Sequence, residues 1–216
     1  MTATALPAST RIAFIGLGHM GGPMATIGGL IRQGLPAARI DVVEPFEATR
    51  AALLQQHGVT ALPAAGEALA RCAVVVWAVK PQTFAEAAAS VKAFAANALH
   101  LSVAAGIPSA SIARWLGTER IVRAMPNTPA LVGQGMTGLF AREAAGAADR
   151  AQVEQVLAPT GRLLWVDDEK ALDAVTAVSG SGPAYVFYFI EAMTEAGVEM
   201  GLTPAQAHQL AVGPFT

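Results

Sequence analysis

A glycine-rich run of the pattern Gly-x-Gly-x-x-Gly begins at Gly16, directly after the apolar residues 12–15 and before a segment with helical character. In such a run the first glycine permits a tight turn, the second lets a pyrophosphate approach the backbone, and the third lets the helix pack closely on the strand. The N-terminus of that helix offers free N–H groups to phosphate oxygens. The run therefore predicts a dinucleotide-binding turn, the alternative being a packing turn without a ligand. The residues expected to contact the dinucleotide are Gly16, Gly18, His19, Met20 and Gly21.

The second expected strand ends at Glu44, roughly 20 residues past the glycines, where nucleotide-binding folds place an acidic residue. A carboxylate there can accept hydrogen bonds from the ribose 2′-hydroxyl of NAD, and it repels the 2′-phosphate of NADP. Arg50, in the helix that follows, carries the opposite charge and can offset that repulsion. The choice between NAD and NADP therefore stays open, and the alternative role of Glu44 is a solvated strand end.

Two further runs combine restricted backbone with polar side chains, namely residues 123–129 (Arg-Ala-Met-Pro-Asn-Thr-Pro) and residues 179–185 (Ser-Gly-Ser-Gly-Pro-Ala-Tyr). Two prolines stiffen the first run. Asn127 between them offers donors and acceptors, so it either serves the chemistry or bonds its own backbone in a turn. Ser181 stands where a hydroxyl caps a helix start, and there it can also help to hold a carboxylate. Arg123 is either a ligand or an ion-pair partner.

Strand-like and helix-like segments alternate along most of the chain, which predicts an α/β protein with a Rossmann-like, doubly wound, mostly parallel sheet. After Asp168 only helices are expected, a long apolar one over residues 183–200 and another starting at Thr203. We therefore expect a dinucleotide-binding domain over residues 9–168 and an all-helical dimerisation domain, truncated, over residues 169–216. The expected strands are residues 11–15, 39–44, 73–79, 99–104, 120–125, 135–141 and 161–166, and the expected helices between them are 20–33, 47–57, 83–96, 109–116 and 147–157.

Parallel sheets bind ligands beyond the carboxyl ends of their strands. In the expected sheet those ends bring Lys80, Ala104 and the segment from Met125 to Thr128 to one crevice over the Gly-rich turn. For Lys80 the plainer alternative is a surface lysine at a strand end. The order of the elements thus predicts one site assembled from several strand ends.

Composition excludes several classes of protein. The 216 residues carry a net charge of −2 with no basic block, so nucleic acid is not an expected partner. No uninterrupted apolar run reaches the ~18–20 residues of a membrane helix, so no membrane association is expected. The single cysteine, Cys72, is expected to be a small buried residue and fits a cytoplasmic location. The four histidines lack metal-ligand spacing, so no metal site is expected.

Four segments together resemble the pyrroline-5-carboxylate reductase family. They are residues 78–82 (Ala-Val-Lys-Pro-Gln), 102–107 (Ser-Val-Ala-Ala-Gly-Ile), 123–129, and 173–185, which ends in Ser-Gly-Ser-Gly-Pro-Ala-Tyr. The resemblance covers the chain from Arg11 to Leu210. The Gly-rich turn departs from it, because the family usually has an amide residue where His19 stands and often an alanine at Gly21. That turn looks more like the 3-hydroxyacid dehydrogenase group.

The resemblance implies a reductase that converts 1-pyrroline-5-carboxylate to L-proline by hydride transfer from NADPH or NADH, the last step of proline biosynthesis. Such a substrate carries a C=N bond that protonates readily and then accepts hydride at carbon, so orientation matters more than acid–base residues. The roles implied for individual residues are catalytic for Asn127 and Ser181, and cofactor-binding for Ala78, Lys80, Ala104, Met125, Pro126, Glu44 and the Gly-rich turn. The resemblance also implies a homo-oligomer, a dimer or larger.

The family usually continues past the point where this chain ends, with a Ser-Pro-Gly-Gly-Thr-Thr loop that binds the substrate carboxylate. We therefore expect a truncated helical domain with poor catalysis, and a second subunit covering the apolar helix at 183–200. Two alternatives stay open. A 3-hydroxyacid dehydrogenase places a catalytic lysine on a long helix of its second domain, and residues 183–200 contain no lysine. A nucleotide-binding protein without catalysis is the other alternative.

Overall fold

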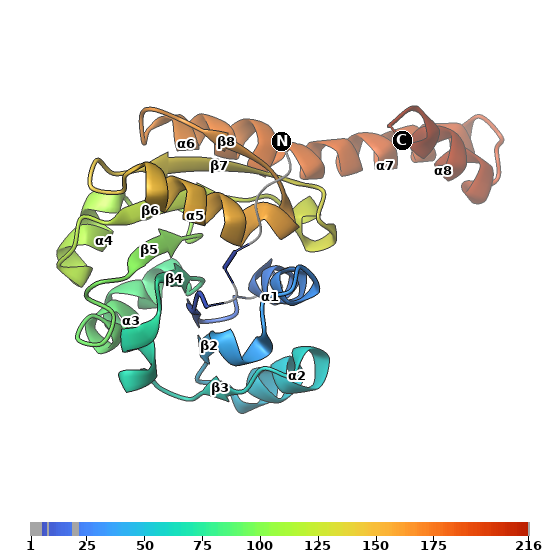
Figure 1. The fold of residues 1–216 in the computed structure, drawn as a ribbon. Helices are drawn as coiled ribbons and strands as arrows, with labels where there is room; N and C mark the ends of the chain where they lie inside the picture. Colours follow the sequence, from blue (N-terminus) through green and yellow to red (C-terminus); the bar gives the residue numbers. More distant parts are fainter. Residues whose placement is uncertain (1–5, 8, 19–21, 216) are drawn as a thin grey trace.

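The computed structural model describes residues 6–7, 9–18 and 22–215, which form an eight-stranded sheet with helices on both faces and a projecting helical arm (Figure 1). The strands lie in the order β3-β2-β1-β4-β5-β6-β7-β8. Each neighbouring pair is parallel except β6 with β7, which is antiparallel. The expected mostly parallel sheet is confirmed. The strands are β1 (Ile12–Ile15), β2 (Ile40–Val43), β3 (Ala61–Leu62), β4 (Val74–Trp77), β5 (Leu99–Ser102), β6 (Ile121–Met125), β7 (Gly135–Ala141) and β8 (Gly161–Trp165).

Strands β1 and β4 form the centre of the sheet, and every one of their residues is buried. Ile12 at the start of β1 lies opposite Ile40 of β2 and Val74 of β4. Such strands are apolar on both faces because crossover helices cover both sides of a parallel sheet.

Two helical layers enclose this sheet. On one face α1 (Gly22–Arg32), α2 (Glu47–His57) and α5 (Ala147–Leu157) share a buried cluster with Phe14 and Val76. On the other face α3 (Phe84–Val91) and α4 (Ser109–Leu116) pack around Trp77. Each large side chain that is fully buried in these layers stabilises the fold by about 1.5–3 kcal/mol relative to an exposed one.

Helix α1 contains two adjacent glycines because it passes very close to its neighbours. A Cβ on Gly29 would lie 2.2 Å from Cβ of Pro159, in the turn that precedes β8. A Cβ on Gly28 would lie 2.6 Å from the ring of His57 at the end of α2. Glycine inside a helix costs about 1 kcal/mol relative to alanine, so close packing is the reason for its presence here.

After β8 the described chain is helical, with α6 (Ala171–Val175), a π-helical turn (Thr176–Gly180), α7 (Gly182–Glu199) and α8 (Pro204–Val212). Gly138 on β7 makes room for α6, because a Cβ there would lie 2.7 Å from Cγ1 of Val175. Helix α7 then leaves the sheet and forms the arm together with α8 (Figure 1). Within the described residues, no helix is both long and apolar enough to cross a membrane.

The expected start of the long helix is confirmed, because α7 begins at Gly182 with Pro183 in its first turn, but the expected hydroxyl cap at Ser181 is wrong. Ser181 has helical backbone angles, and its side chain makes no capping hydrogen bond. Its N–H instead donates to the carbonyl of Thr176, five residues earlier, at 2.8 Å. The π turn leads directly into α7, so Ser181 lies between two helical segments and does not cap a free helix end. Helix α8 does begin as expected, with Thr203 and Gln206 forming a reciprocal capping box.

Two other boundaries differ from expectation. The two-residue strand β3 at the edge of the sheet was not expected, since so short a pairing leaves no alternation in the sequence. Helix α3 ends at Val91 rather than residue 96, because the N–H of Phe94 turns back to the carbonyl of Val91. Neither difference alters the order of the strands.

Cys72 is buried as expected, at 6% exposure. Its Sγ lies 3.4 Å from Oδ2 of Asp41. Burial, together with the negative charge of Asp41, raises the pKa of the Cys72 thiol to about 12. The thiol therefore stays protonated at neutral pH and behaves as a core side chain.

A buried histidine links β4 to β5. Trp77 Nε1 donates to Nδ1 of His100 at 3.0 Å, and His100 is 1% exposed. A nitrogen that accepts this bond carries no proton, so the ring is neutral. Burial lowers the pKa of His100 from 6.5 to about 4, helped by the charge of Arg120 and opposed by a hydrogen bond to the Ala95 backbone.

We expect stability to fall as the pH is lowered from about 6.5 to about 4. The unfolded chain binds a proton on His100 within this range and the folded chain does not, so full stability is present above the range. The free energy of unfolding should decrease by up to about 3 kcal/mol as the pH approaches 4. Urea unfolding of wild type and His100→Gln over this range measures the effect, which should be smaller in the variant. His208→Gln, which alters an exposed histidine on α8, should match wild type, and equal pH slopes in all three proteins would contradict the assignment.

Candidate active site

The Gly-rich turn lies at the carboxyl end of β1, next to the end of β4. Gly16 and Gly18 have φ angles of +75° and +60°, a backbone region that glycine favours. A Cβ on Gly16 would lie 3.0 Å from the carbonyl oxygen of Ala78, so packing against β4 requires glycine. A Cβ on Gly18 would make only ordinary contacts, the nearest at 3.5 Å. At Gly18 only the left-handed backbone and the approach of a ligand call for glycine. His19, Met20 and Gly21 lie outside the described residues.

Glu44 lies at the end of β2 as expected, but its side chain has surroundings that the sequence did not predict. Its side chain is buried, with 5% of the residue exposed. Oε2 accepts a hydrogen bond from the N–H of Leu17 at 3.0 Å, and Oε1 accepts one from the N–H of Phe46 at 3.1 Å. The carboxylate therefore holds the Gly-rich turn to the loop after β2, and it is not a solvated strand end. Its expected contact with a ribose stays a prediction, whereas these contacts support a structural role.

Arg50 lies beside the same loop. Its Nη1 donates to the carbonyl oxygens of Glu44 at 3.0 Å and Pro45 at 2.6 Å. These bonds hold the guanidinium over the loop that follows β2. The positive charge of Arg50 therefore lies beside the loop whose residues bear on the choice between NAD and NADP. The carboxylate of Glu44, in the same loop, is buried.

The other strand ends lie along the same edge of the sheet. The N–H of Ala78 donates to the carbonyl of Ile15, and the N–H of Val103 donates to the carbonyl of Trp77. Ala104, which follows, is buried and donates its N–H to Oγ of Ser102 at 3.3 Å. Lys80 is exposed. The structure thus brings Ala78 and Ala104 to one edge with Gly16, as expected, and leaves Lys80 at the surface of that edge.

Asn127 bridges three segments through its side-chain amide. Its Nδ2 donates to the carbonyl of Ser179 at 3.0 Å, and its Oδ1 accepts from the N–H of Met136 at 2.9 Å. In a regular helix the N–H of residue 183 would donate to the Ser179 carbonyl, but Pro183 has no N–H. Asn127 supplies the missing donor from another part of the chain. The Asn127 side chain therefore does not bond its own backbone in a turn. It links its loop to the segments that contain Ser179 and Met136.

Met125 lies next to the π turn. A Cβ on Gly180 would lie 3.3 Å from its Cε, so Gly180 lets the thioether side chain approach the helix. Pro126 and Asn127, which follow Met125, are partly buried. Ser181 is partly buried one residue past Gly180. The two motifs at residues 123–129 and 179–185 are therefore in contact, which their separation in sequence does not reveal.

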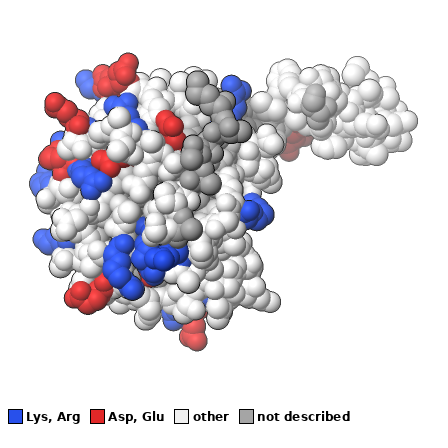
Figure 2. All heavy atoms as spheres, in the orientation of Figure 1, with Lys and Arg blue, Asp and Glu red and all other residues white. Residues whose placement is uncertain are grey.

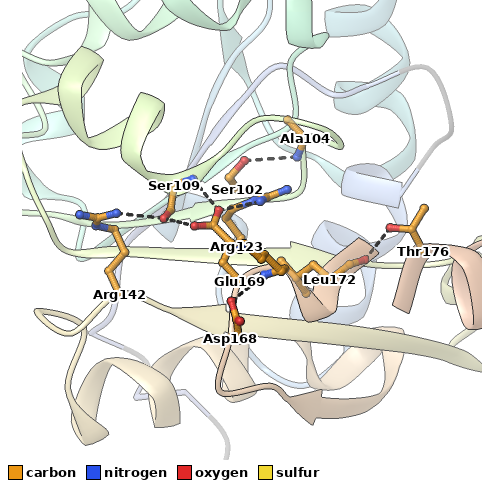
Figure 3. Close-up of polar contacts among 10 residues, drawn as sticks. Ser102, Ala104, Ser109, Arg123, Arg142, Asp168, Glu169, Leu172 and Thr176 are labelled. Atoms are coloured by element: carbon orange, nitrogen blue, oxygen red, sulfur yellow. Dashed lines mark hydrogen bonds and ion pairs between the residues drawn. The ribbon is translucent and has the colours of Figure 1, made fainter. Parts of the chain in front are cut away.

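A polar cluster beside this contact was not predicted from the sequence (Figure 3). Glu169, in the loop between β8 and α6, accepts hydrogen bonds from the N–H and Oγ of Ser109 and from Nη1 of Arg123, each at 2.6 Å. Arg142 Nη1 donates to Oγ of Ser109 at 3.0 Å. Arg123 is thus an ion-pair partner, which was one of its two expected roles. The only sequence signal was an acidic residue ahead of the second motif, and nothing in it pointed to Ser109.

No metal chemistry is indicated within the part of the chain that the structure describes. No group of three or more His, Cys, Asp or Glu side chains there could hold a metal ion. The arrangement instead offers a Gly-rich turn for a dinucleotide and a stiff, hydrogen-bonded loop beside it. Such a site can hold two reactants in a fixed geometry.

Two family models match this chain. One, described as pyrroline-5-carboxylate reductase dimerisation, matches residues 169–215. The other, described as NADP oxidoreductase, coenzyme F420-dependent, matches residues 11–106. The second match includes the Gly-rich turn and the ends of β1, β4 and β5.

Several similar proteins are named pyrroline-5-carboxylate reductase. A pyrroline-5-carboxylate reductase of Pseudomonas aeruginosa is 47% identical over 202 residues, which is 93% of this chain and 73% of the relative. One from Haemophilus influenzae is 42% identical over 201 residues, 92% of this chain and 73% of the relative. Among solved structures, the Coxiella burnetii enzyme of that name has a TM-score of 0.89 at 34% identity, covering 96% of this chain and 77% of that one. The Plasmodium falciparum pyrroline carboxylate reductase with NADP bound has a TM-score of 0.81 at 28% identity, covering 96% and 76%.

Replacing Gly18 by alanine should weaken dinucleotide binding about tenfold, because the added methyl group stands where a phosphate approaches the backbone. Titration with NADPH and with NADH, followed by fluorescence, measures the dissociation constants. Gly58→Ala is the matched control, since Gly58 has a φ angle of +65° and no atom near its missing Cβ. It therefore imposes similar backbone strain on α2 without touching the turn. Equal affinities in folded Gly18→Ala and Gly58→Ala would contradict the assignment.

Proposed function

Because this chain belongs to the pyrroline-5-carboxylate reductase family, we propose that the carboxyl edge of β1, β4, β5 and β6 is its active site. The protein is an NAD(P)H-dependent oxidoreductase that reduces 1-pyrroline-5-carboxylate to L-proline, the last step of proline biosynthesis. One observation carries the placement: the Gly-rich turn, which contacts Ala78, shares this edge with the loop that bears Asn127. The names of the relatives favour the reductase over a 3-hydroxyacid dehydrogenase and over a protein without catalysis.

The residues at this edge fit a nicotinamide dinucleotide. Gly18 has no side chain at a position where packing alone does not require glycine. The N-terminus of α1 follows the turn, and its positive dipole end favours phosphate. When bound, the reduced dinucleotide supplies the hydride. Gly16, Gly18, Ala78, Lys80, Ala104, Met125 and Pro126 are the described residues that we propose to hold it.

Either NADPH or NADH suits the loop after β2. Both carboxylate oxygens of Glu44 accept hydrogen bonds from backbone N–H groups, whose partial positive charges offset part of its repulsion of a 2′-phosphate. The Arg50 guanidinium lies over the same loop and attracts a phosphate. These contacts support acceptance of NADPH, and a ribose hydroxyl of NADH meets no obstacle in them.

The reaction adds a hydride to the carbon of a protonated C=N bond, and the electron pair of that bond goes to nitrogen. The side chains therefore need to orient the two reactants and to exclude water. Met125 and Pro126 supply an apolar wall, and Asn127 keeps the shape of the loop through its two backbone partners. We propose catalytic roles for Asn127 and Ser181 because they lie where the two motifs meet.

The protein should oxidise NADPH or NADH only when 1-pyrroline-5-carboxylate is present, and L-proline should form in equal amount. Loss of nicotinamide absorbance together with amino-acid analysis measures both. Running each dinucleotide separately gives the ratio of kcat/KM values and so tests the acceptance of NADPH argued from Arg50. Turnover of 3-hydroxyisobutyrate with NAD, and none with the imine, would overturn the proposal in favour of the dehydrogenase.

The chain forms a homo-oligomer through its C-terminal helices, as the match to a dimerisation family over residues 169–215 indicates. We propose that α7 pairs two copies and that residues 169–216 act as a separate dimerisation domain. The arm is almost entirely uncharged in the view of Figure 2. Large apolar side chains are exposed around α7, and a helix that is apolar on most sides is normally buried. They are Tyr185, Val186, Phe187, Tyr188, Phe189 and Met193. The cytoplasmic location stays a prediction from the single cysteine.

Phe187→Glu should convert the oligomer to smaller species, because burying an unpaired carboxylate in an apolar interface is strongly unfavourable. Phe187 is 66% exposed in the single chain. Light scattering after size-exclusion chromatography gives the molar mass at several concentrations. Leu54→Glu, at a 51% exposed site on α2, is the control and should keep the mass of wild type. An unchanged mass for Phe187→Glu would place the interface elsewhere.

A further inference from the structure

The carboxylate of Glu169 joins three segments that meet at the proposed active site. It accepts hydrogen bonds from the N–H and Oγ of Ser109 and from Nη1 of Arg123, all at 2.6 Å (Figure 3). Such short, charge-assisted bonds are about twice as strong as those between neutral groups. Glu169 itself stands in the loop ahead of α6. One side chain therefore connects α4, β6 and the start of α6.

The contact with Ser109 caps a helix from another part of the chain. Ser109 is the first residue of α4 and is fully buried. The local N-cap residue, Pro108, makes no side-chain capping bond. A carboxylate at a helix N-terminus satisfies a free N–H and is favoured by the helix dipole. The loop that follows β5 and contains Ala104 ends at this cap, so Glu169 fixes its far end.

The contact with Arg123 fixes the strand that carries the Asn127 loop. Arg123 and Met125 lie two residues apart on β6 and therefore point to the same face of the sheet. Met125 approaches Gly180 on that face. A shift of Arg123 along the strand direction would move Met125 and Asn127 with it.

The third segment is the short helical run that follows Glu169, from α6 to the π turn. Val175 of α6 packs into the space left by Gly138. Further along, the carbonyl of Ser179 accepts the bond from Asn127 at 3.0 Å. Contacts of Glu169 ahead of this run and of Asn127 at its end therefore hold it to β6 and to the loop that follows β6.

We propose that Glu169 is a positioning residue for hydride transfer, which sets the β5 loop, the Asn127 loop and the π turn in one arrangement without touching either reactant. This inference rests on the proposed function. Displacing reacting groups by about 1 Å can cost on the order of 100-fold in rate. Because Glu169 holds the loops around the reactants in place, its removal is expected to lower the rate of hydride transfer more than the affinity for the cofactor.

The charges around Glu169 support an ionised carboxylate. Burial opposes ionisation, but the hydrogen bonds from Ser109 and Arg123 and the charge of Arg123 outweigh it and lower the pKa of Glu169. Arg142 reaches the same Ser109 hydroxyl and also pairs with Glu119. The neighbouring Asp168 accepts a bond from the Lys170 N–H. The contribution of Glu169 is present above its ordinary pKa, and it is lost as the pH falls through the lowered value.

Glu169→Ala and Glu169→Gln test this role in the intact protein. In the alanine variant we expect kcat with 1-pyrroline-5-carboxylate to fall by about tenfold or more, while the dissociation constant of NADPH changes less than about twofold. With NADPH deuterated at the transferred position, the primary isotope effect on kcat/KM should increase, because hydride transfer becomes more rate-limiting. Glu169→Gln keeps the volume and one acceptor oxygen, should show a smaller fall, and carries the test if the alanine variant does not fold.

Glu119→Gln is the matched control, because it removes a carboxylate that bonds the outer side of Arg142, with Nε of Arg142 2.6 Å from Oε2 of Glu119. It should leave kcat and the isotope effect as in wild type. Folded Glu169 variants with unchanged kcat and isotope effect would overturn the inference, as would equal losses in kcat and NADPH affinity. A wild-type protein without imine turnover would instead overturn the proposed function, so the two failures are distinguishable.

Discussion

The parallel pairing of β1 with β2 on one side and β4 on the other is the constraint on which the rest of the structure depends. Parallel neighbours need crossover connections, so each of these strands ends at the same edge and a helix returns over one face. The edge is tied by backbone bonds, from Gly16 to Val43 and from Ala78 to Ile15. Helices occupy both faces of the sheet, and this edge is where the loops gather. A site assembled from strand ends follows from this pairing.

Two carboxylates, of which Glu44 is buried and Glu169 partly buried, then set the shape of that edge. Glu44 bonds the backbone of Leu17 and Phe46, and Glu169 bonds Ser109 and Arg123. Removing a carboxylate from water is unfavourable unless its oxygens find donors, so each position specifies one arrangement of the surrounding loops. Neither residue needs to exchange a proton in a reaction that asks mainly for orientation. Acidic residues here fix loop geometry, and the described part of the site contains no evident acid–base pair.

The sequence predicted the elements best where a periodic pattern and a stop signal coincide. Helices α2 and α4 have the expected bounds, and each ends at a glycine with a positive φ angle, Gly58 and Gly117. At Ser181 the pattern predicted the start of α7 correctly, but not the π turn before it or the absence of a capping bond from the hydroxyl. It also did not reveal that Glu44 is buried and accepts hydrogen bonds from the N–H groups of Leu17 and Phe46. In both cases the missing information was a hydrogen bond to a residue outside the motif itself.

The sequence by itself determined the mostly parallel fold, the Gly-rich turn and the two motifs of the family, because each depends on residue type at short spacing. Only the tertiary structure decided which groups meet. Asn127 bonds Ser179 across 52 residues, and Glu169 bonds Ser109 across 60. Pro183 explains the first contact, since its missing N–H leaves a carbonyl that a remote amide must satisfy. The local sequence shows that the Ser179 carbonyl lacks a helical donor, but the packing of whole elements determines which residue supplies one.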